Sequence, residues 1–330
     1  MTSKSKPSIT AFHRKLHAWY GAHGRKDLPW RHTQDAYHIY VSEVMLQQTQ
    51  VKTVLERYYG PFLKRFPSLE ALKRASRQEV LTAWQGLGYY SRAANLHKAA
   101  ELCGRSLPQQ VEQLMELPGI GRNTAHAIAA FAYYQPVPVM EANVKRIIAR
   151  VFALEYPTSE ELWEKAFILL DRKQPFDYNQ AMMDIGSLVC TKRNPNCPVC
   201  PANVICEGQR SPESYPAPKT KKATPIRRKH IIVQQNAQGF YYSTVRTSRF
   251  LQGLYHFIEQ EAAPTKATLL GHVTQQYSHF TLDADIWLMK TAKSGKDWYG
   301  FKQLSKLPMS MAEKKILQLL EAANSARSSA

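Results

Sequence analysis

Apolar residues recur at helical spacing through roughly the first 190 residues of the chain. The positions that show this spacing include Ile39, Val44, Val51, Leu55 and Tyr58, and further along Ala125, Ile128, Ala129 and Ala132. Prolines and glycines separate these runs, as is usual between short helices. The pattern therefore predicts a helical region from about Ala11 to Cys190.

Beyond residue 229 the apolar pattern shortens to a period of two. Alternation in 230–235, 240–245 and 272–289 predicts β-strands, and Met311–Ala323 fits a last helix. A stretch rich in proline, lysine and arginine precedes the first strand and is typical of a charged connector. The predicted parts are a helical domain, a cysteine loop, a basic linker and a small α+β domain, at 8–189, 190–206, 207–229 and 230–325.

The charge of the chain narrows the function classes. Its 330 residues include 44 lysines and arginines against 26 acids, a formal net charge of +18. Such an excess favours binding to a polyanion, with a merely soluble basic surface as the alternative. No apolar run is long enough for a membrane span, and residues 1–10 lack the apolar core of a signal peptide. We therefore expect a cytoplasmic protein without a membrane partner.

Four of the five cysteines lie close together with the spacing C-x6-C-x2-C-x5-C; they are Cys190, Cys197, Cys200 and Cys206. Four thiolates at this spacing suit either a four-iron cluster or a tetrahedral zinc ion. The wide first gap favours the iron–sulfur cluster. Disulfides fit poorly because no secretory signal accompanies the cysteines.

The segment Leu117–Gly121 contains two glycines just before an apolar helix. Gly119 and Gly121 allow a tight turn and close approach of a partner, and the following helix presents free backbone N–H groups. A helix–hairpin–helix at about 112–133 would grip a DNA phosphate in this way without reading sequence. A simple packing corner between two helices is the alternative.

A single acid, Glu43, stands among apolar and amide residues in a predicted helix. Leu46 and Gln47 lie on the same side of that helix. Partial removal from water raises the pKa of a carboxyl, which suits a general acid near neutral pH. A solvated surface glutamate is the alternative.

In combination, these motifs resemble the adenine DNA glycosylases of the MutY type, which belong to the helix–hairpin–helix superfamily that includes endonuclease III. The resemblance runs from about residue 8 to 207. The segments that carry it, besides the cysteine loop, are SEVMLQQTQV, WQGLGYYSRAANLHKAA, ELPGIGRNTA, ANVKRIIARV and NQAMMDIGSLVC. It implies a mostly α glycosylase domain followed by a small α+β, Nudix-like domain.

The resemblance implies a monomer of the bacterial nucleoid that carries one 4Fe-4S cluster and removes adenine opposite 8-oxoguanine or guanine in double-stranded DNA. The adenine must first be flipped out of the duplex. Glu43 would protonate adenine N7, and Glu141 would face the positive charge on the sugar. The residues with implied DNA or base contacts are Trp30, Arg31, Leu46, Gln47, Gln48, Tyr89, Gly119, Gly121, Asn123, Asn143, Gln180, Tyr277, Ser278 and His279.

The C-terminal part resembles that family's domain for recognition of oxidised guanine, through 250–257 and 276–280. Tyr277, Ser278 and His279 match the loop that inspects the damaged base. The glutamate-rich, metal-binding helix of a Nudix hydrolase is missing from this stretch of sequence. We therefore expect this domain to bind without hydrolysing.

Three positions bear on the chemistry that the resemblance implies. Asn123 stands where relatives that cut the strand carry a lysine, so we expect base removal without efficient strand cleavage. Glu141-Ala142 replaces the family's Asp-Gly, and His126 replaces its usual glycine. We expect a slow enzyme that the change back to Asp-Gly accelerates. In the alternative, the pocket has re-formed around the longer acid and the same change slows the enzyme.

Two other functions remain open from the sequence. The same fold could remove another mispaired base, such as thymine or uracil. The chain could also be a lesion-binding protein with weak or no catalysis, which the Glu141 and Ala142 replacements suggest.

Overall fold

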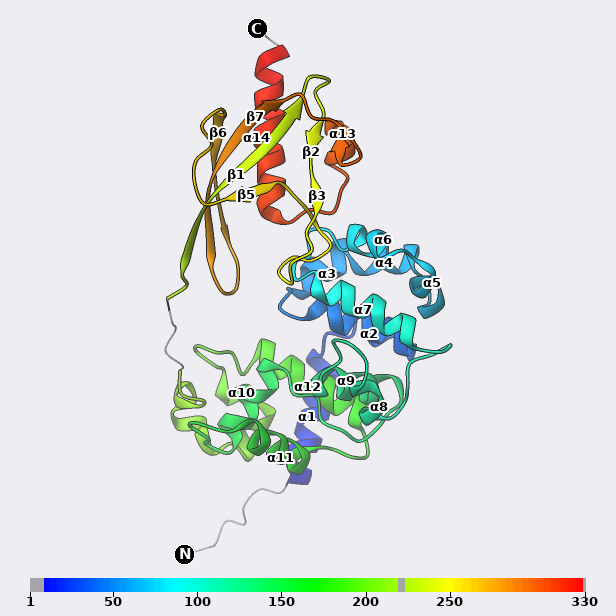
Figure 1. The fold of residues 1–330 in the computed structure, drawn as a ribbon. Coiled ribbons are helices and arrows are strands. Elements are labelled where there is room, and N and C mark those ends of the chain that lie inside the picture. Colours follow the sequence, from blue (N-terminus) through cyan, green and yellow to red (C-terminus); the bar gives the residue numbers. More distant parts are fainter. Residues whose placement is uncertain (1–8, 219–222, 329–330) are drawn as a thin grey trace, which may run out of the picture. The chain divides into compact units, whose positions relative to one another are not determined.

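The structure is a computed structural model that describes residues 9–218 and 223–328 (Figure 1). The chain divides into two compact units. The first unit comprises residues 1–70 and 98–220, and the second comprises 71–97 and 221–330. Residues 71–97 thus group with the C-terminal part of the chain. The domain boundaries drawn from the sequence stay a prediction, and part of the predicted linker, 219–222, lies outside the described residues.

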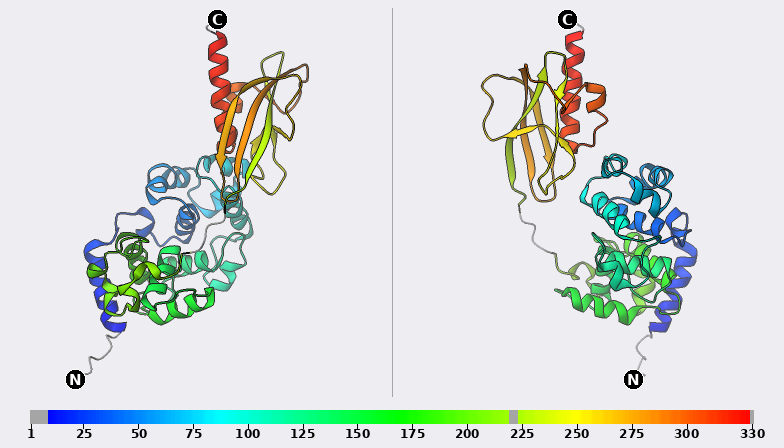
Figure 2. Two further views of the ribbon diagram at one scale, coloured as in Figure 1. Left: turned by 90° about the vertical axis from the view of Figure 1, so that its left-hand side faces the viewer. Right: turned by 45° about the vertical axis from the view of Figure 1, so that its right-hand side comes forward.

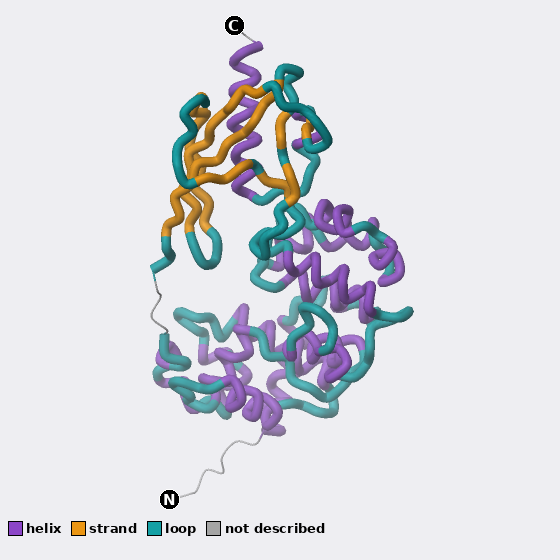
Figure 3. The backbone as a smooth tube through the Cα atoms, in the orientation of Figure 1, coloured by secondary structure: helices purple, strands orange, loops and turns teal. Residues whose placement is uncertain are grey.

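Helices make up the regular structure of the first unit (Figure 3). Its helices are α1 (Ile9–His23), α2 (Ala36–Leu46), α3 (Val51–Arg57), α4 (Tyr59–Arg65), α8 (Val111–Met115), α9 (Arg122–Ala132), α10 (Ala142–Val151), α11 (Ser159–Leu169) and α12 (Pro175–Leu188). Side-chain caps fix where some of them begin. Asp35 accepts hydrogen bonds from the backbone N of Tyr37 and His38 at the start of α2, and Thr158 caps α11.

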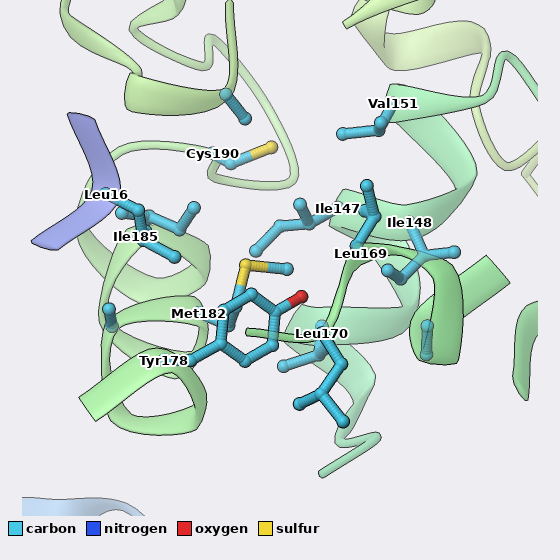
Figure 4. Close-up of a cluster of buried hydrophobic side chains, with 14 of the residues drawn as sticks. Leu16, Ile147, Ile148, Val151, Leu169, Leu170, Tyr178, Met182, Ile185 and Cys190 are labelled. Carbon is cyan, nitrogen blue, oxygen red and sulfur yellow. The ribbon is translucent and has the colours of Figure 1, made fainter. Parts of the chain in front are cut away.

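A core of buried apolar side chains joins α1, α10, α11 and α12. Figure 4 shows part of it, with Met182 and Ile185 of α12 beside Ile147 of α10. Gly186 allows α10 and α12 to approach closely, since a Cβ there would lie 2.7 Å from Cβ of Asn143. This packing fixes the N-terminus of α10, which follows Glu141 directly.

The predicted helix–hairpin–helix consists of α8, a turn and α9. Gly119 has a φ of +77°, a left-handed conformation that glycine adopts without strain. Gly121 is the N-cap of α9, and a Cβ at this position would meet no described atom within 4 Å. Packing within the chain therefore gives no reason for glycine at 121, which leaves room for close approach of a partner.

The second unit combines helices with a mixed sheet (Figure 2). Its elements are α6 (Arg77–Ala83), α7 (Ser91–Leu102, which continues into the first unit), β1 (Ile226–Asn236), β2 (Tyr241–Tyr242), β3 (Thr244–Val245), β4 (Tyr255–His256), β5 (Ile258–Gln260), β6 (Thr268–Gln276), β7 (Thr281–Thr291), β8 (Trp298–Tyr299), α13 (Phe301–Leu304) and α14 (Met311–Ser328). Helix α5 (Leu69–Arg74) spans the division between the units.

The sheet has the strand order β6-β7-β1-β2-β8, with β5 also paired to β1. Strands β1 and β7 are parallel, whereas β6 and β7 form an antiparallel hairpin. Alternate residues of β7 are buried, and α14 packs against the same core. The predicted α+β class is confirmed, and the alternating stretch 272–289 proves to be parts of two strands joined by a turn at 277–280. In the described part of the chain, no helix is both long and apolar enough to cross a bilayer.

Candidate active site

Glu43 lies in α2, a helix that is buried along most of its length. Its neighbours within α2 are apolar or uncharged, and Glu43 itself is only 8% exposed. Burial raises the pKa of the Glu43 carboxyl well above its usual range, and the nearby Glu141 raises it further, while Arg31 opposes the shift. This raised pKa favours the protonated form of Glu43 that a general acid needs near neutral pH.

A cavity of about 230 Å³ opens beside Glu43. It brings together seven of the residues predicted from the sequence: Trp30, Arg31, Glu43, Leu46, Glu141, Asn143 and Gln180. They come from α2, α10, α12 and the turn η1 (Pro29–Arg31). The cavity is thus built by segments far apart in the sequence, and the roles of these side chains stay predictions.

An ion pair that the sequence analysis missed supports one wall of this cavity. Asp184 of α12 is fully buried and accepts hydrogen bonds from both Nη atoms of Arg31, at 2.8 and 2.9 Å. Arg25 donates to the same carboxylate from its backbone N and its Nε, at 2.9 and 2.8 Å. Burial raises the pKa of Asp184, but these hydrogen bonds outweigh it, so the pKa lies below its usual range. An acid inside an apolar helix was the available signal in the sequence.

Glu141 is the N-cap of α10 and reaches the cavity half-buried. The pKa of its carboxyl lies above its usual range, because burial raises it by more than Arg25 and Arg31 lower it. The two guanidiniums thus favour the charged form of Glu141 against the effect of burial. Glu43 and Glu141 lie close enough that a negative charge on Glu141 disfavours ionisation of Glu43. Sites that use one acid as proton donor and the other as a negative charge have such a pair.

Gln180 of α12 supplies an acceptor to the cavity. Its side chain is 3% exposed, and its Oε1 has no hydrogen-bond partner among the described residues. A buried oxygen without a partner costs free energy unless a ligand donates to it. Trp30 is also buried and packs edge-on against Tyr59. Asn143 accepts a hydrogen bond from Arg146.

Three other predicted residues of the first unit lie at helix ends. Gln47 is the C-cap of α2, and its Nε2 donates to Oγ1 of Thr124 at 3.3 Å. Gln48 has a φ of +56°, which is uncommon for a residue with a side chain and is often found at functional sites. Asn123 lies in the first turn of α9. Its Oδ1 accepts a hydrogen bond from the backbone N of Met140 at 2.6 Å.

Tyr89 belongs to the second unit, in the turn between α6 and α7. Its φ is +47° and its side chain is 44% exposed. The next residue, Tyr90, is buried and donates a hydrogen bond to the carbonyl of Met309 at 3.1 Å. Gln85 donates to the carbonyl of Leu307 at 3.0 Å. The turn that presents Tyr89 is thus anchored on the C-terminal part of the second unit.

The predicted base-reading loop is the tip of the β6–β7 hairpin. The backbone N of Tyr277 donates to the carbonyl of Phe280 at 2.9 Å, so only Ser278 and His279 stand at the tip. Both are exposed, and Oγ of Ser278 lies 2.9 Å from Nδ1 of His279. The Tyr277 ring packs against Phe280 and Phe250. The packed turn thus presents two exposed polar side chains that lie within hydrogen-bond distance of one another.

The four clustered cysteines line one cavity of the first unit beside α10 and α12. Burial raises the pKa of the Cys200 thiol to about 12, and the other three cysteines add to this shift. As placed, the thiols do not form a metal-ligand group, nor do other side chains in 9–218 and 223–328. The buried Arg150 donates to Sγ of Cys190 at 3.2 Å, and its carbonyl accepts from Sγ of Cys206 at 3.4 Å.

The fold and this site define the class of the protein. Residues 41–169 match the HhH-GPD superfamily of base excision DNA repair proteins. A thermostable thymine-DNA glycosylase has a similar structure, with a TM-score of 0.57 and 26% identity over 61% of this chain and 96% of that one. The chain is thus a helix–hairpin–helix protein of base excision repair.

Curated relatives identify the family within this class. The adenine DNA glycosylase of Buchnera aphidicola subsp. Acyrthosiphon pisum is 34% identical, over 68% of this chain and 67% of its own. That of subsp. Schizaphis graminum is 29% identical, over 95% of this chain and 100% of its own. The chain belongs to the adenine DNA glycosylase family, which confirms the resemblance seen in the sequence.

The raised pKa of Glu43 makes a prediction about stability. A folded-state pKa above the unfolded value of 4.5 means that the contribution of Glu43 to stability is lost as pH rises through the folded pKa. Glu43→Gln should therefore raise the unfolding temperature, by about 2–4 °C for each kcal/mol recovered. The gain should grow between about pH 5 and pH 8.

Thermal unfolding at several pH values measures this gain. The control is Glu56→Gln, since Glu56 is an exposed glutamate of α3 that forms an ion pair with the exposed Lys52 at 3.8 Å. The difference in unfolding temperature between Glu56→Gln and wild type should not grow with pH. An equal effect of pH on Glu43→Gln and Glu56→Gln would show that Glu43 is not held in its neutral form.

Proposed function

We propose that this protein is a monofunctional glycosylase that hydrolyses the bond between adenine and deoxyribose where adenine is mispaired with 8-oxoguanine or guanine. The observation that carries this proposal is the buried, protonatable Glu43 beside a second carboxyl, Glu141, in one cavity. The names of the curated relatives support adenine as the base. The net charge of +18 suits double-stranded DNA as the partner. The resemblance implies that a monomer binds this DNA at the nucleoid of a bacterial cytoplasm.

The reaction divides between the two acids. The Glu43 carboxyl gives its proton to N7 of the flipped adenine, so that the base leaves as a neutral molecule with the electron pair of the glycosidic bond. The sugar is left as a cation, which the negative charge of Glu141 stabilises. Glu43, now a carboxylate, takes a proton from the water that adds to the sugar. Gln180 suits the amino group of adenine, because its Oε1 is a buried acceptor.

Strand cleavage is not part of the proposed activity. A lyase needs an amine that attacks the sugar and forms a Schiff base. Asn123 stands at the position where strand-cutting relatives carry lysine, and its amide oxygen already accepts from Met140. The amide nitrogen of asparagine is not a nucleophile. The product is therefore an intact strand with an abasic site.

Adenine release from an 8-oxoguanine:adenine duplex, measured in a single turnover, tests the proposed reaction. Glu43→Gln should lower the rate by about 10²- to 10⁴-fold with lesion binding retained, because it removes a proton and leaves the shape of the cavity. The wild-type rate should also fall as pH rises, since Glu43 loses its proton above its raised pKa.

The control for this rate is again Glu56→Gln, whose carboxyl lies outside the cavity. Near-wild-type rates in Glu43→Gln would assign the acid to another residue. Duplexes with mispaired thymine or uracil test the rival base, and faster release of either would overturn adenine as the substrate. Binding without release of any base would favour the lesion-binding alternative.

The cysteine loop is proposed to hold one 4Fe-4S cluster. The donor set fits, because the four thiols line one cavity and each lies close enough to affect the pKa of Cys200. Arg150 fits as well, being 2% exposed and surrounded by backbone carbonyls and Sγ of Cys190. A buried cation in such a place suits a negatively charged thiolate cluster. The bound cluster would order the loop and take no part in base release.

Metal analysis of anaerobically purified protein should give about four iron atoms per chain. Cys200→Ser should lose the iron and weaken DNA binding, because the loop loses its order. Cys103→Ser is the control, since Cys103 lies outside the loop and should leave the iron content unchanged. Stoichiometric zinc without iron in the wild-type protein would contradict the proposal.

The β6–β7 hairpin tip is proposed to read oxidised guanine. Ser278 and His279 are the exposed polar residues at that tip, and the packing of Tyr277 against Phe250 holds the turn beneath them. Hydrogen bonds from such a tip can distinguish bases by ~1–3 kcal/mol each. The absence of a Nudix metal helix in the sequence agrees with binding alone.

Rates on 8-oxoguanine:adenine and guanine:adenine duplexes test this reading. Ser278→Ala with His279→Ala should reduce the preference for the oxidised duplex roughly tenfold, since the tip loses its hydrogen bonds. Ser294→Ala, in the turn that follows β7, is the control and should keep the preference. An unchanged rate ratio in the double variant would assign the reading of the base to other residues.

A further inference from the structure

The segment 137–140, which leads into Glu141, lies outside the helices and strands and is bonded by side chains. Asn179 of α12 makes two of these bonds: its Nδ2 donates to the carbonyl of Val137 at 2.9 Å, and its Oδ1 accepts from the backbone N of Val139 at 2.8 Å. Asn179 is 1% exposed. One side of this segment is therefore fixed by a buried amide.

Helix α9 holds the same segment through two further side chains. Nδ1 of His126 lies 2.8 Å from the carbonyl of Pro138, and because a carbonyl only accepts, Nδ1 carries the proton. Oδ1 of Asn123 accepts from the backbone N of Met140 at 2.6 Å. These two residues are three apart in a helix and so share one face. Together with Asn179 they bond a backbone group of every residue from Val137 to Met140.

The imidazole of His126 is itself rigidly placed. It is 4% exposed, and its ring centroid lies 4.7 Å from that of Trp163 and 6.0 Å from that of Phe167. Burial lowers the pKa of His126, which favours the neutral ring, and its Nδ1 proton is directed at the carbonyl of Pro138. Because the ring cannot shift freely, its hydrogen bond fixes the position of the Pro138 carbonyl.

We propose that His126 is a positioning residue for Glu141. Through the carbonyl of Pro138, and with Asn123 at Met140, it sets the backbone from which the longer acid reaches the sugar. This inference rests on the proposed role of Glu141 as the stabilising charge. Displacement of a reacting group by about 1 Å can cost roughly a hundredfold in rate, which gives a hydrogen bond at Pro138 a large effect.

The same geometry favours a pocket that has re-formed around glutamate. With the backbone held at 137–140, a shorter acid at 141 stops short of the position that Glu141 reaches. We therefore expect Glu141→Asp with Ala142→Gly to lower the single-turnover rate, the opposite of the acceleration expected from the sequence alone. A rise in rate would overturn the inference, because it would mean that the segment is not set for the longer side chain.

Two replacements of His126 separate its hydrogen bond from its packing. His126→Phe keeps the ring contacts and loses the donor, whereas His126→Asn keeps an N–H close to the place of Nδ1 and loses the ring. We expect His126→Phe to be about 10- to 100-fold slower than wild type, with His126→Asn faster than His126→Phe. The unfolding temperature should follow the opposite order, with His126→Phe more stable than His126→Asn, because the phenylalanine ring keeps the packing contacts. Rates that merely follow the unfolding temperatures would assign His126 a packing role and overturn the proposal.

A double-mutant cycle shows whether His126 acts through Glu141. In a Glu141→Ala background, His126→Phe should cause almost no further loss, because residues that act through one another are not additive. An equal loss in both backgrounds would overturn the inference. If Glu141→Ala keeps the wild-type rate, the proposed function of Glu141 fails instead, so the two failures are distinguishable.

A control and a second variant complete the test. His97 is also buried, and its Nε2 lies 2.8 Å from the carbonyl of Ala75, in the second unit. His97→Phe should lower the unfolding temperature and leave the rate unchanged.

If His126→Phe fails to fold, Asn123→Leu removes the bond to Met140 and should show the same dependence on Glu141. Loss of rate from Asn123→Leu in the Glu141→Ala background would then overturn the proposal.

Discussion

The buried ion pair of Asp184 with Arg31 and Arg25 is the constraint on which the rest of the site depends. A carboxylate with no exposed surface is stable only if its charge is matched and its oxygens are hydrogen-bonded, and removal of a partner costs ~3–5 kcal/mol. These bonds join α12 to the segment that leads into η1, more than a hundred residues away in the sequence. They place Trp30 in the cavity wall and bring two guanidiniums close to Glu141.

Glu43 shows the opposite outcome of burial. Asp184 receives four hydrogen bonds from two arginines and stays charged. Glu43 lies in an apolar helix with a second acid near it, so its pKa rises and it holds a proton. Arg31, whose Nη atoms donate to Asp184, only partly offsets this rise, because burial has the larger effect on Glu43. One arginine thus contributes to a low pKa at one acid without making the other ionise, and the cavity keeps its acid protonated.

Local patterns in the sequence predicted the elements of this protein better than its long-range contacts. The two glycines of 117–121 and the lone acid at 43 carry their chemistry within a few residues, and the structure has a helix–hairpin–helix and a buried carboxyl there. The alternation of apolar residues did not by itself show the turn that splits 272–289, although the resemblance had placed a loop at 277–279. The pairing of Asp184 with Arg25 was not foreseen, because apolar periodicity says nothing about which charges meet in space. The sequence also did not predict that 71–97 group with the C-terminal part, because this grouping depends on contacts between residues far apart in the chain.

Separate groups of residues set the charge and the position of the second acid. Arg25 and Arg31 favour the ionised form of Glu141, and neither bonds the backbone that carries it. The backbone is held by neutral groups from α9 and α12, among them His126. A change in side-chain length at 141 therefore alters reach but not the charges that act on the carboxyl. A neutral donor such as His126 can adjust that reach without disturbing the proton on Glu43, because it adds no charge to the cavity.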